Sequence, residues 1–154
     1  MTDNAATTYE ESEMPAIHVD APAEAVYGAI SDLTRHADWA KDDLSIEAVD
    51  DAPLEVGKRY TSSNQGKAPD QVTVTELVPG QRFGFRSLMA NGLELTHTMT
   101  VSEQAGGTMV TRDSKCTAAP GMKVLFRPLI ALVAPMDGKK NLKAMKAVLE
   151  QSGS

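Results

Sequence analysis

The sequence predicts an α+β fold in which a curved antiparallel sheet of about six or seven strands wraps around one long C-terminal helix. Three observations support this prediction. Short segments of alternating apolar and polar residues, separated by turn-forming residues, occupy residues 44–118. Two short helical patterns follow the first strand-like segment, and a long helical pattern follows the last one. A sheet and a helix of this kind bury their apolar faces against each other.

The first elements are a strand and two short helices. Ile17 and Val19 alternate with polar neighbours, which is typical of a strand. Pro22 suits the first position of a helix, and the charge of Glu24 is favourable in the first helical turn. Apolar residues then recur at helical spacing at Val26, Ala29, Ile30 and Leu33. We expect a second short helix in TRHADWAKDDL, starting at Thr34.

The central part of the chain is predicted to be a meander of antiparallel strands. Turn chemistry separates the segments, through Pro–Gly or Asn–Gly pairs and a glycine-containing loop. The predicted strands are LSIEAVDD, GKRYTSSN, QVTVTELV, RFGFRSLMA, LELTHTMTVSE and TMVTRDSKCTA.

The register of the last two strands follows from the loop 104–107. A four-residue loop pairs Glu103 with Thr108, Val101 with Val110, Met99 with Arg112 and His97 with Ser114. A slip by one residue would bury the charged side chains of Asp113 and Lys115, which is costly. We therefore expect His97, Arg112 and Ser114 to share the inner face.

From Met122 the apolar spacing becomes helical again and continues to about Glu150. Pro128 and Pro135 are expected to start or kink this helix. Because a sheet cannot close tightly along the whole helix, we expect a cavity between the apolar stripe of the helix and the sheet. Such cavities hold apolar ligands.

Length and charge limit the classes of function. The 154 residues favour one domain, predicted over residues 14–151, after an acidic and disordered tail over residues 1–13. The net charge of -6 argues against nucleic acid and against stable association with an anionic membrane. The sequence contains neither a signal-peptide pattern nor an apolar run long enough to span a bilayer. We expect a cytoplasmic monomer or homodimer without stable membrane insertion.

The order of these segments resembles the START-like superfamily of polyketide cyclases/dehydrases and lipid-transfer domains. The opening IHVDAPAEAVYGAISDLTRHADWA, the hairpin VTVTELVPGQRFGFRS, the turn GGTMVT and the closing LFRPLIALV and NLKAMKAVLE carry the resemblance. It implies the helix-grip fold and a pocket for lipids, polyketides, sterols or other hydrophobic molecules. It does not imply one reaction, because the superfamily contains both enzymes and carriers.

His97 is the first candidate for a functional role, since it lies in an otherwise apolar row. It is a core histidine hydrogen-bonded to Ser114 or to a backbone carbonyl, a polar contact in the pocket, or a weak candidate for a catalytic residue. Arg112 either meets a ligand acid or carbonyl or reaches solvent at the open end of the barrel. The full set of expected ligand-binding residues is Trp39, Tyr60, Phe83, Phe85, Met89, Leu95, His97, Met99, Arg112, Ser114, Phe126 and Leu129.

Three functions remain open from the sequence. The leading hypothesis is a carrier for a hydrophobic or amphipathic small molecule. The second is a cyclase/dehydratase that uses His97, and the third is the chaperone-assisting type of interaction module that the resemblance implies. The histidines His18, His36 and His97 lack metal-ligand spacing, so we expect no metal. The sequence also lacks a phosphate-binding glycine loop, and we expect no cofactor. The absence of a clear acid–base pair favours the carrier.

Overall fold

The computed structural model describes residues 15–39, 45–63, 68–90, 92–118, 139–140 and 142–151. The expected disordered tail over residues 1–13 and the pocket candidates Phe126 and Leu129 lie outside these residues. So does the predicted first half of the long closing helix. Among the helices in the described ranges, none is long and apolar enough to cross a membrane.

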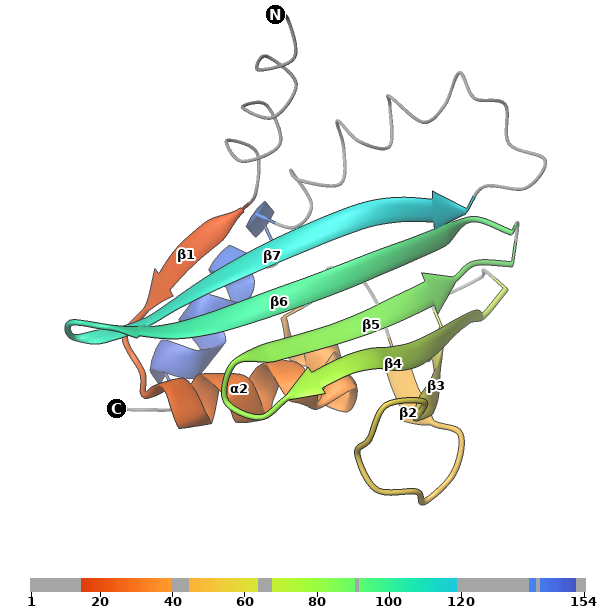
Figure 1. Cartoon of the computed structure of the whole chain (residues 1–154), viewed down its shortest axis with the longest axis horizontal. Coiled ribbons are helices and arrows are strands. Elements are labelled where there is room, and N and C mark those ends of the chain that lie inside the picture. Colours follow the sequence, from red (N-terminus) through yellow and green to blue (C-terminus); the bar gives the residue numbers. More distant parts are fainter. Residues whose placement is uncertain are drawn as a thin grey trace, which may run out of the picture.

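Seven antiparallel strands form one sheet, which confirms the predicted architecture (Figure 1). Their order is β1-β7-β6-β5-β4-β3-β2, so the first two strands lie at opposite edges. The bounds are β1 Ala16–Val19, β2 Ser45–Ala48, β3 Arg59–Ser63, β4 Asp70–Val78, β5 Arg82–Leu88, β6 Glu94–Gln104 and β7 Gly107–Ala118.

The pairing of β6 with β7 has the predicted register. His97 lies opposite Ser114 and Met99 lies opposite Arg112. The strands are joined by a turn in which Gly106 has a φ of 81°, a conformation that favours glycine. Next to it, a Cβ atom on Gly107 would lie 2.4 Å from the carbonyl oxygen of Val19, so the edge strand β1 packs closely here.

Two short helical elements follow β1, as expected, but the second is a 3₁₀ helix. The α-helix α2 spans Ala23–Ser31, and Pro22 occupies its N-cap rather than its first helical position. The 3₁₀ helix η1 spans Leu33–Asp38. It begins one residue before Thr34, because the Asp32 side chain accepts a hydrogen bond from the Thr34 amide and caps the element.

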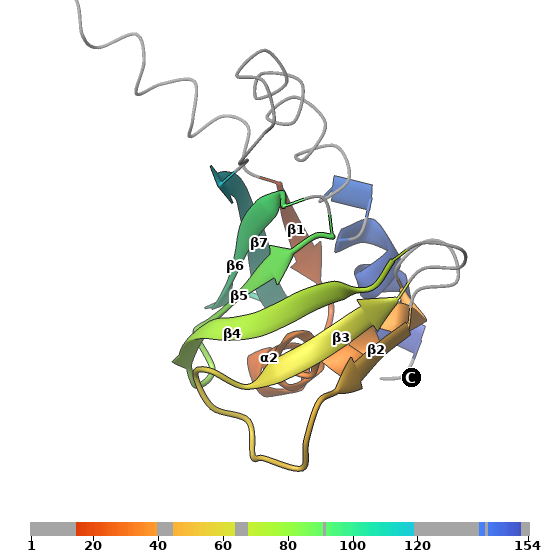
Figure 2. The same cartoon turned by 90° about the vertical axis from the view of Figure 1, so that its right-hand side faces the viewer.

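The helices cover one face of the sheet. Figure 1 shows α2 and the C-terminal helix, described over residues 139–140 and 142–151, on the same side of the strands, and in Figure 2 the sheet curves over α2. The core combines fully buried side chains from both layers, including Val26, Ile30, Phe83, Met99, Val110, Leu142 and Met145. Burial of this apolar face is what holds the layers together.

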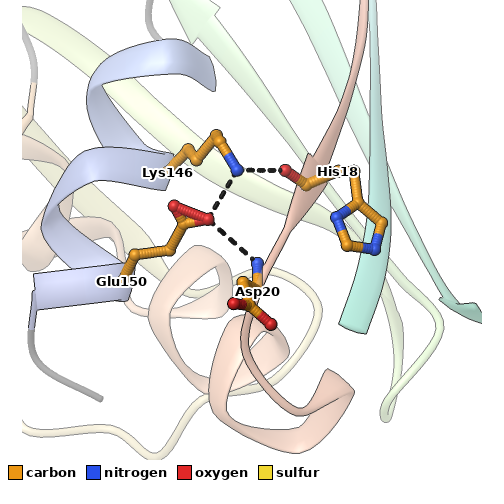
Figure 3. A network of polar contacts seen from close by, with 4 residues as sticks. All are labelled: His18, Asp20, Lys146 and Glu150. Atoms are coloured by element: carbon orange, nitrogen blue, oxygen red, sulfur yellow. Dashed lines mark hydrogen bonds and ion pairs between the residues drawn. The ribbon is translucent and has the colours of Figure 1, made fainter. Parts of the chain in front are cut away.

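A polar clamp fastens the C-terminal helix to β1 (Figure 3). The Lys146 ammonium donates a hydrogen bond of 2.8 Å to the His18 carbonyl and pairs with Glu150 one helical turn away. Glu150 accepts a hydrogen bond of 3.2 Å from the Asp20 amide. The hydrogen bond from Lys146, followed by that from Asp20, holds the pKa of Glu150 below its usual range.

Replacement of Met145 tests how firmly the C-terminal helix packs into the core. Met145→Ala should lower the unfolding free energy by about 2–5 kcal/mol, because the fully buried side chain leaves a cavity. The matched control Lys143→Ala alters an exposed position of the same helix and should change it by less than about 0.5 kcal/mol. Urea unfolding measures both, and equal effects would contradict this packing.

Candidate functional site

A cavity of about 140 Å³ lies between η1 and the concave face of the sheet. The walls consist of apolar and aromatic side chains with a few polar groups among them. This volume is close to the ~150 Å³ at which an apolar cavity accepts one benzene ring. The lining residues are Leu33, His36, Trp39, Ile46, Ser62, Val72, Phe85, Ser87, His97 and Arg112.

Four of the residues that the sequence singled out line this cavity: Trp39, Phe85, His97 and Arg112. A fifth, Ser114, does not line it but contacts His97. The side chains of Tyr60, Phe83 and Met99 are buried in the core, and those of Met89 and Leu95 are partly exposed, all outside the set that lines the cavity. The structure therefore brings four of the ten expected residues that it describes to this cavity.

Six lining residues were absent from the sequence-based set: Leu33, His36, Ile46, Ser62, Val72 and Ser87. Strand alternation could have revealed some of them. Ser87 continues the row of Phe83 and Phe85 by two residues. His36 lies three residues after Leu33, a spacing that places both on one side of a 3₁₀ helix.

The His97 imidazole is neutral and its tautomer follows from its neighbours. Its Nδ1 lies 2.8 Å from Ser114 Oγ and 3.4 Å from Nη2 of Arg112. A guanidinium can only donate, so Nδ1 carries the lone pair and Nε2 carries the proton. Burial lowers the pKa of His97 to about 3, and the charge of Arg112 adds to this effect.

The His36 imidazole is also neutral, with a proton on Nε2. This nitrogen lies 2.9 Å from the carbonyl oxygen of Ile30, which can only accept a hydrogen bond. Burial lowers the pKa of His36 to about 4, while the Ile30 hydrogen bond opposes the shift. At neutral pH its Nδ1 is therefore an acceptor.

Tilted and edge-to-face ring contacts connect η1 to β6 along the cavity wall. The ring centroids of His36 and Trp39 are 5.1 Å apart. His36 and Phe85 are arranged edge to face, with their ring centroids 5.7 Å apart. Phe85 also lies 4.8 Å from His97 and 5.8 Å from Phe83. Such contacts stabilise aromatic clusters and give the wall a fixed shape.

The cavity has one charged residue among its lining and limited catalytic chemistry. Its ten described lining residues include one cation, Arg112, and no carboxylate. His97 and Ser114 are within hydrogen-bond distance, but an imidazole with a pKa of about 3 is a weak base for activating a hydroxyl. Within the described part of the chain, no three His, Cys, Asp or Glu residues are grouped to hold a metal ion.

The buried imidazoles predict a pH dependence of stability. The unfolded chain binds protons on His36 and His97 near pH 6.5, whereas the folded chain does not. The free energy of unfolding is therefore highest above this pH and decreases as the pH falls below it. Between about pH 6.5 and 5 the decrease is up to about 1.4 kcal/mol per pH unit for each histidine. Urea unfolding across this window measures the slope, and His97→Phe should reduce it. An unchanged slope in the variant would contradict the neutral imidazole.

Solved structures similar to this chain include two linked to biosynthesis. DynU16, from the dynemicin biosynthetic locus, is 22% identical with a TM-score of 0.63, over 90% of this chain and 47% of that one. The di-domain ARO/CYC StfQ from the steffimycin biosynthetic pathway is 12% identical with a TM-score of 0.69, over 99% of this chain and 56% of that one. The chain thus spans about half the length of each.

A third similar structure, of protein MLL2253 from Mesorhizobium loti, has nearly the same length as this chain. It is 14% identical with a TM-score of 0.69, over 90% of this chain and 97% of that one. At these identities the three structures show the shared fold.

No curated protein matches the chain significantly. The model of the family described as polyketide cyclase / dehydrase and lipid transport matches residues 8–150, nearly the whole length, and the chain therefore belongs to that family.

Proposed function

We propose that the protein binds a small amphipathic molecule in the cavity between η1 and the sheet. The observation that carries this proposal is the placement of Arg112 and His97 in a wall whose other side chains are mostly apolar or aromatic. Membership of a family described by polyketide cyclisation and lipid transport supports it. A cytoplasmic location, as a monomer or homodimer, is part of the same proposal.

Two interactions provide affinity and orientation. Burial of apolar ligand surface contributes about 25 cal/mol per Å². A carbonyl or carboxylate oxygen of the ligand accepts hydrogen bonds from the Arg112 guanidinium and from Nε2–H of His97. Since the cavity holds about one ring, we expect it to take the polar end of a ligand together with the first apolar group.

The charge of Arg112 predicts a preference for anionic ligands. Octanoate should bind more tightly than 1-octanol, because charged hydrogen bonds contribute more to affinity than neutral ones. For the same reason, Arg112→Gln should lower the affinity for octanoate by about 10-fold or more. The affinity for 1-octanol should change little. Fluorescence of Trp39, the only tryptophan of the chain and a lining residue, measures both affinities.

The control for this experiment is Lys115→Gln. It removes one positive charge from the same strand, but from an exposed side chain that pairs with Asp113. Octanoate affinity should therefore stay unchanged. Equal losses in the two variants would indicate a long-range charge effect and contradict a direct contact with Arg112.

A cyclase or dehydratase is the second candidate, favoured by the family description and by the ARO/CYC named among the similar structures. The geometry limits how it would work. With a pKa of about 3, His97 is a poor general base, so its role would be to donate a hydrogen bond from Nε2–H to a ketone oxygen and, together with Arg112, to polarise that carbonyl. Turnover of a poly-ketone that is unchanged in a folded His97→Ala variant would exclude this role.

A further inference from the structure

Two imidazoles that line the cavity each have one ring nitrogen without a hydrogen-bond partner among the described residues. These nitrogens are Nδ1 of His36 and Nε2 of His97, since the hydrogen bonds of each ring involve the other nitrogen. The two side chains are only 7% and 9% exposed. Even so, neither nitrogen is among the fully buried and unpaired polar atoms of the described side chains, so both remain accessible from the cavity and available to a ligand.

The end of α2 fixes the orientation of the His36 ring. Ile30 lies in the last turn of this helix, where carbonyl groups lack an intrahelical partner. Donation from His36 Nε2 satisfies this carbonyl. A flip of the ring would leave the carbonyl unpaired and is therefore unfavourable. The acceptor at Nδ1 is thus a fixed property of the site.

The two free nitrogens have opposite hydrogen-bonding character. Nδ1 of His36 accepts a hydrogen bond, whereas Nε2 of His97 donates one, in the direction set by Ser114 and Arg112. Phe85 contacts both imidazoles, with centroid distances of 5.7 and 4.8 Å. Both histidines also line the same cavity of about 140 Å³, so a ring-sized ligand group in it lies against both imidazoles.

We infer that the cavity selects a ligand group of about one ring that carries both a hydroxyl and a carbonyl or carboxylate oxygen. The hydroxyl donates to Nδ1 of His36, and the second oxygen accepts from His97 and Arg112. This inference rests on the proposed binding function and adds His36 as the residue that determines specificity. A ligand with only one of the two groups leaves one imidazole nitrogen dehydrated and unpaired, which costs affinity.

Matched pairs of small ligands test the inference on the unmodified protein. The ortho, meta and para hydroxybenzoates are compared by calorimetry with the corresponding fluorobenzoates, which have nearly the same shape but cannot donate a hydrogen bond. At least one hydroxybenzoate should bind about 10-fold more tightly than its fluorinated partner. Equal affinities in all three pairs would overturn the inference while leaving the proposed function intact. No binding of any of them, or of octanoate, would overturn both.

Two variants separate the roles of the imidazoles. His36→Phe keeps an aromatic ring but removes the acceptor, so the preference for the hydroxyl should disappear. His97→Phe should lower the affinities for the hydroxybenzoate and for its fluorinated partner by the same factor, so the preference for the hydroxyl should remain. A preference that survives in His36→Phe would overturn the role of His36.

Nitrogen NMR of the imidazoles provides a test that does not depend on the folding of a variant. In the free protein Nδ1 of His36 should show the shift of an unprotonated nitrogen, and the preferred hydroxybenzoate should move that shift while its fluorinated partner does not. A protonated Nδ1 in the free protein, or equal shifts with both ligands, would overturn the inference.

Discussion

The register between β6 and β7 is the constraint on which both the core and the site depend. Period two along these strands places Met99, Val101 and Val110 on the buried face. The same parity places His97 and Arg112 there. A shift by one residue would exchange this face for the one with Asp113 and Lys115, so the apolar core and the polar end of the cavity form together or not at all.

This coupling explains why part of the site could be predicted from the sequence. Alternation and a four-residue loop were sufficient to pair Met99 with Arg112 and His97 with Ser114. Alternation identifies which residues of a strand point to the inner face of the sheet, but not which of them reach the cavity. Phe83 and Phe85 belong to one row, yet only Phe85 reaches the cavity, because Phe83 is fully covered in the core.

His36 could not be recognised in the same way. It belongs to a 3₁₀ helix of six residues, which is too short to show a reliable period. Its orientation depends on the carbonyl at the end of α2, and sequence patterns do not reveal which carbonyl groups lack partners. Local patterns therefore predicted the strands and their pairing, whereas the part of the site that comes from a helix end required the three-dimensional structure.

The position of β1 has a consequence for how the chain folds during synthesis. This N-terminal strand pairs with β7, and the carbonyl of His18 meets the side chain of Lys146 across 128 residues of sequence. A ribosome delivers both partners after the strands from β2 to β6, so β1 stays unpaired while the hairpins between β3 and β7 form from neighbouring segments. Contacts between such distant residues slow folding. Closure of the sheet edge is therefore a late event, and until then the exposed backbone of β7 is open to pairing with other chains.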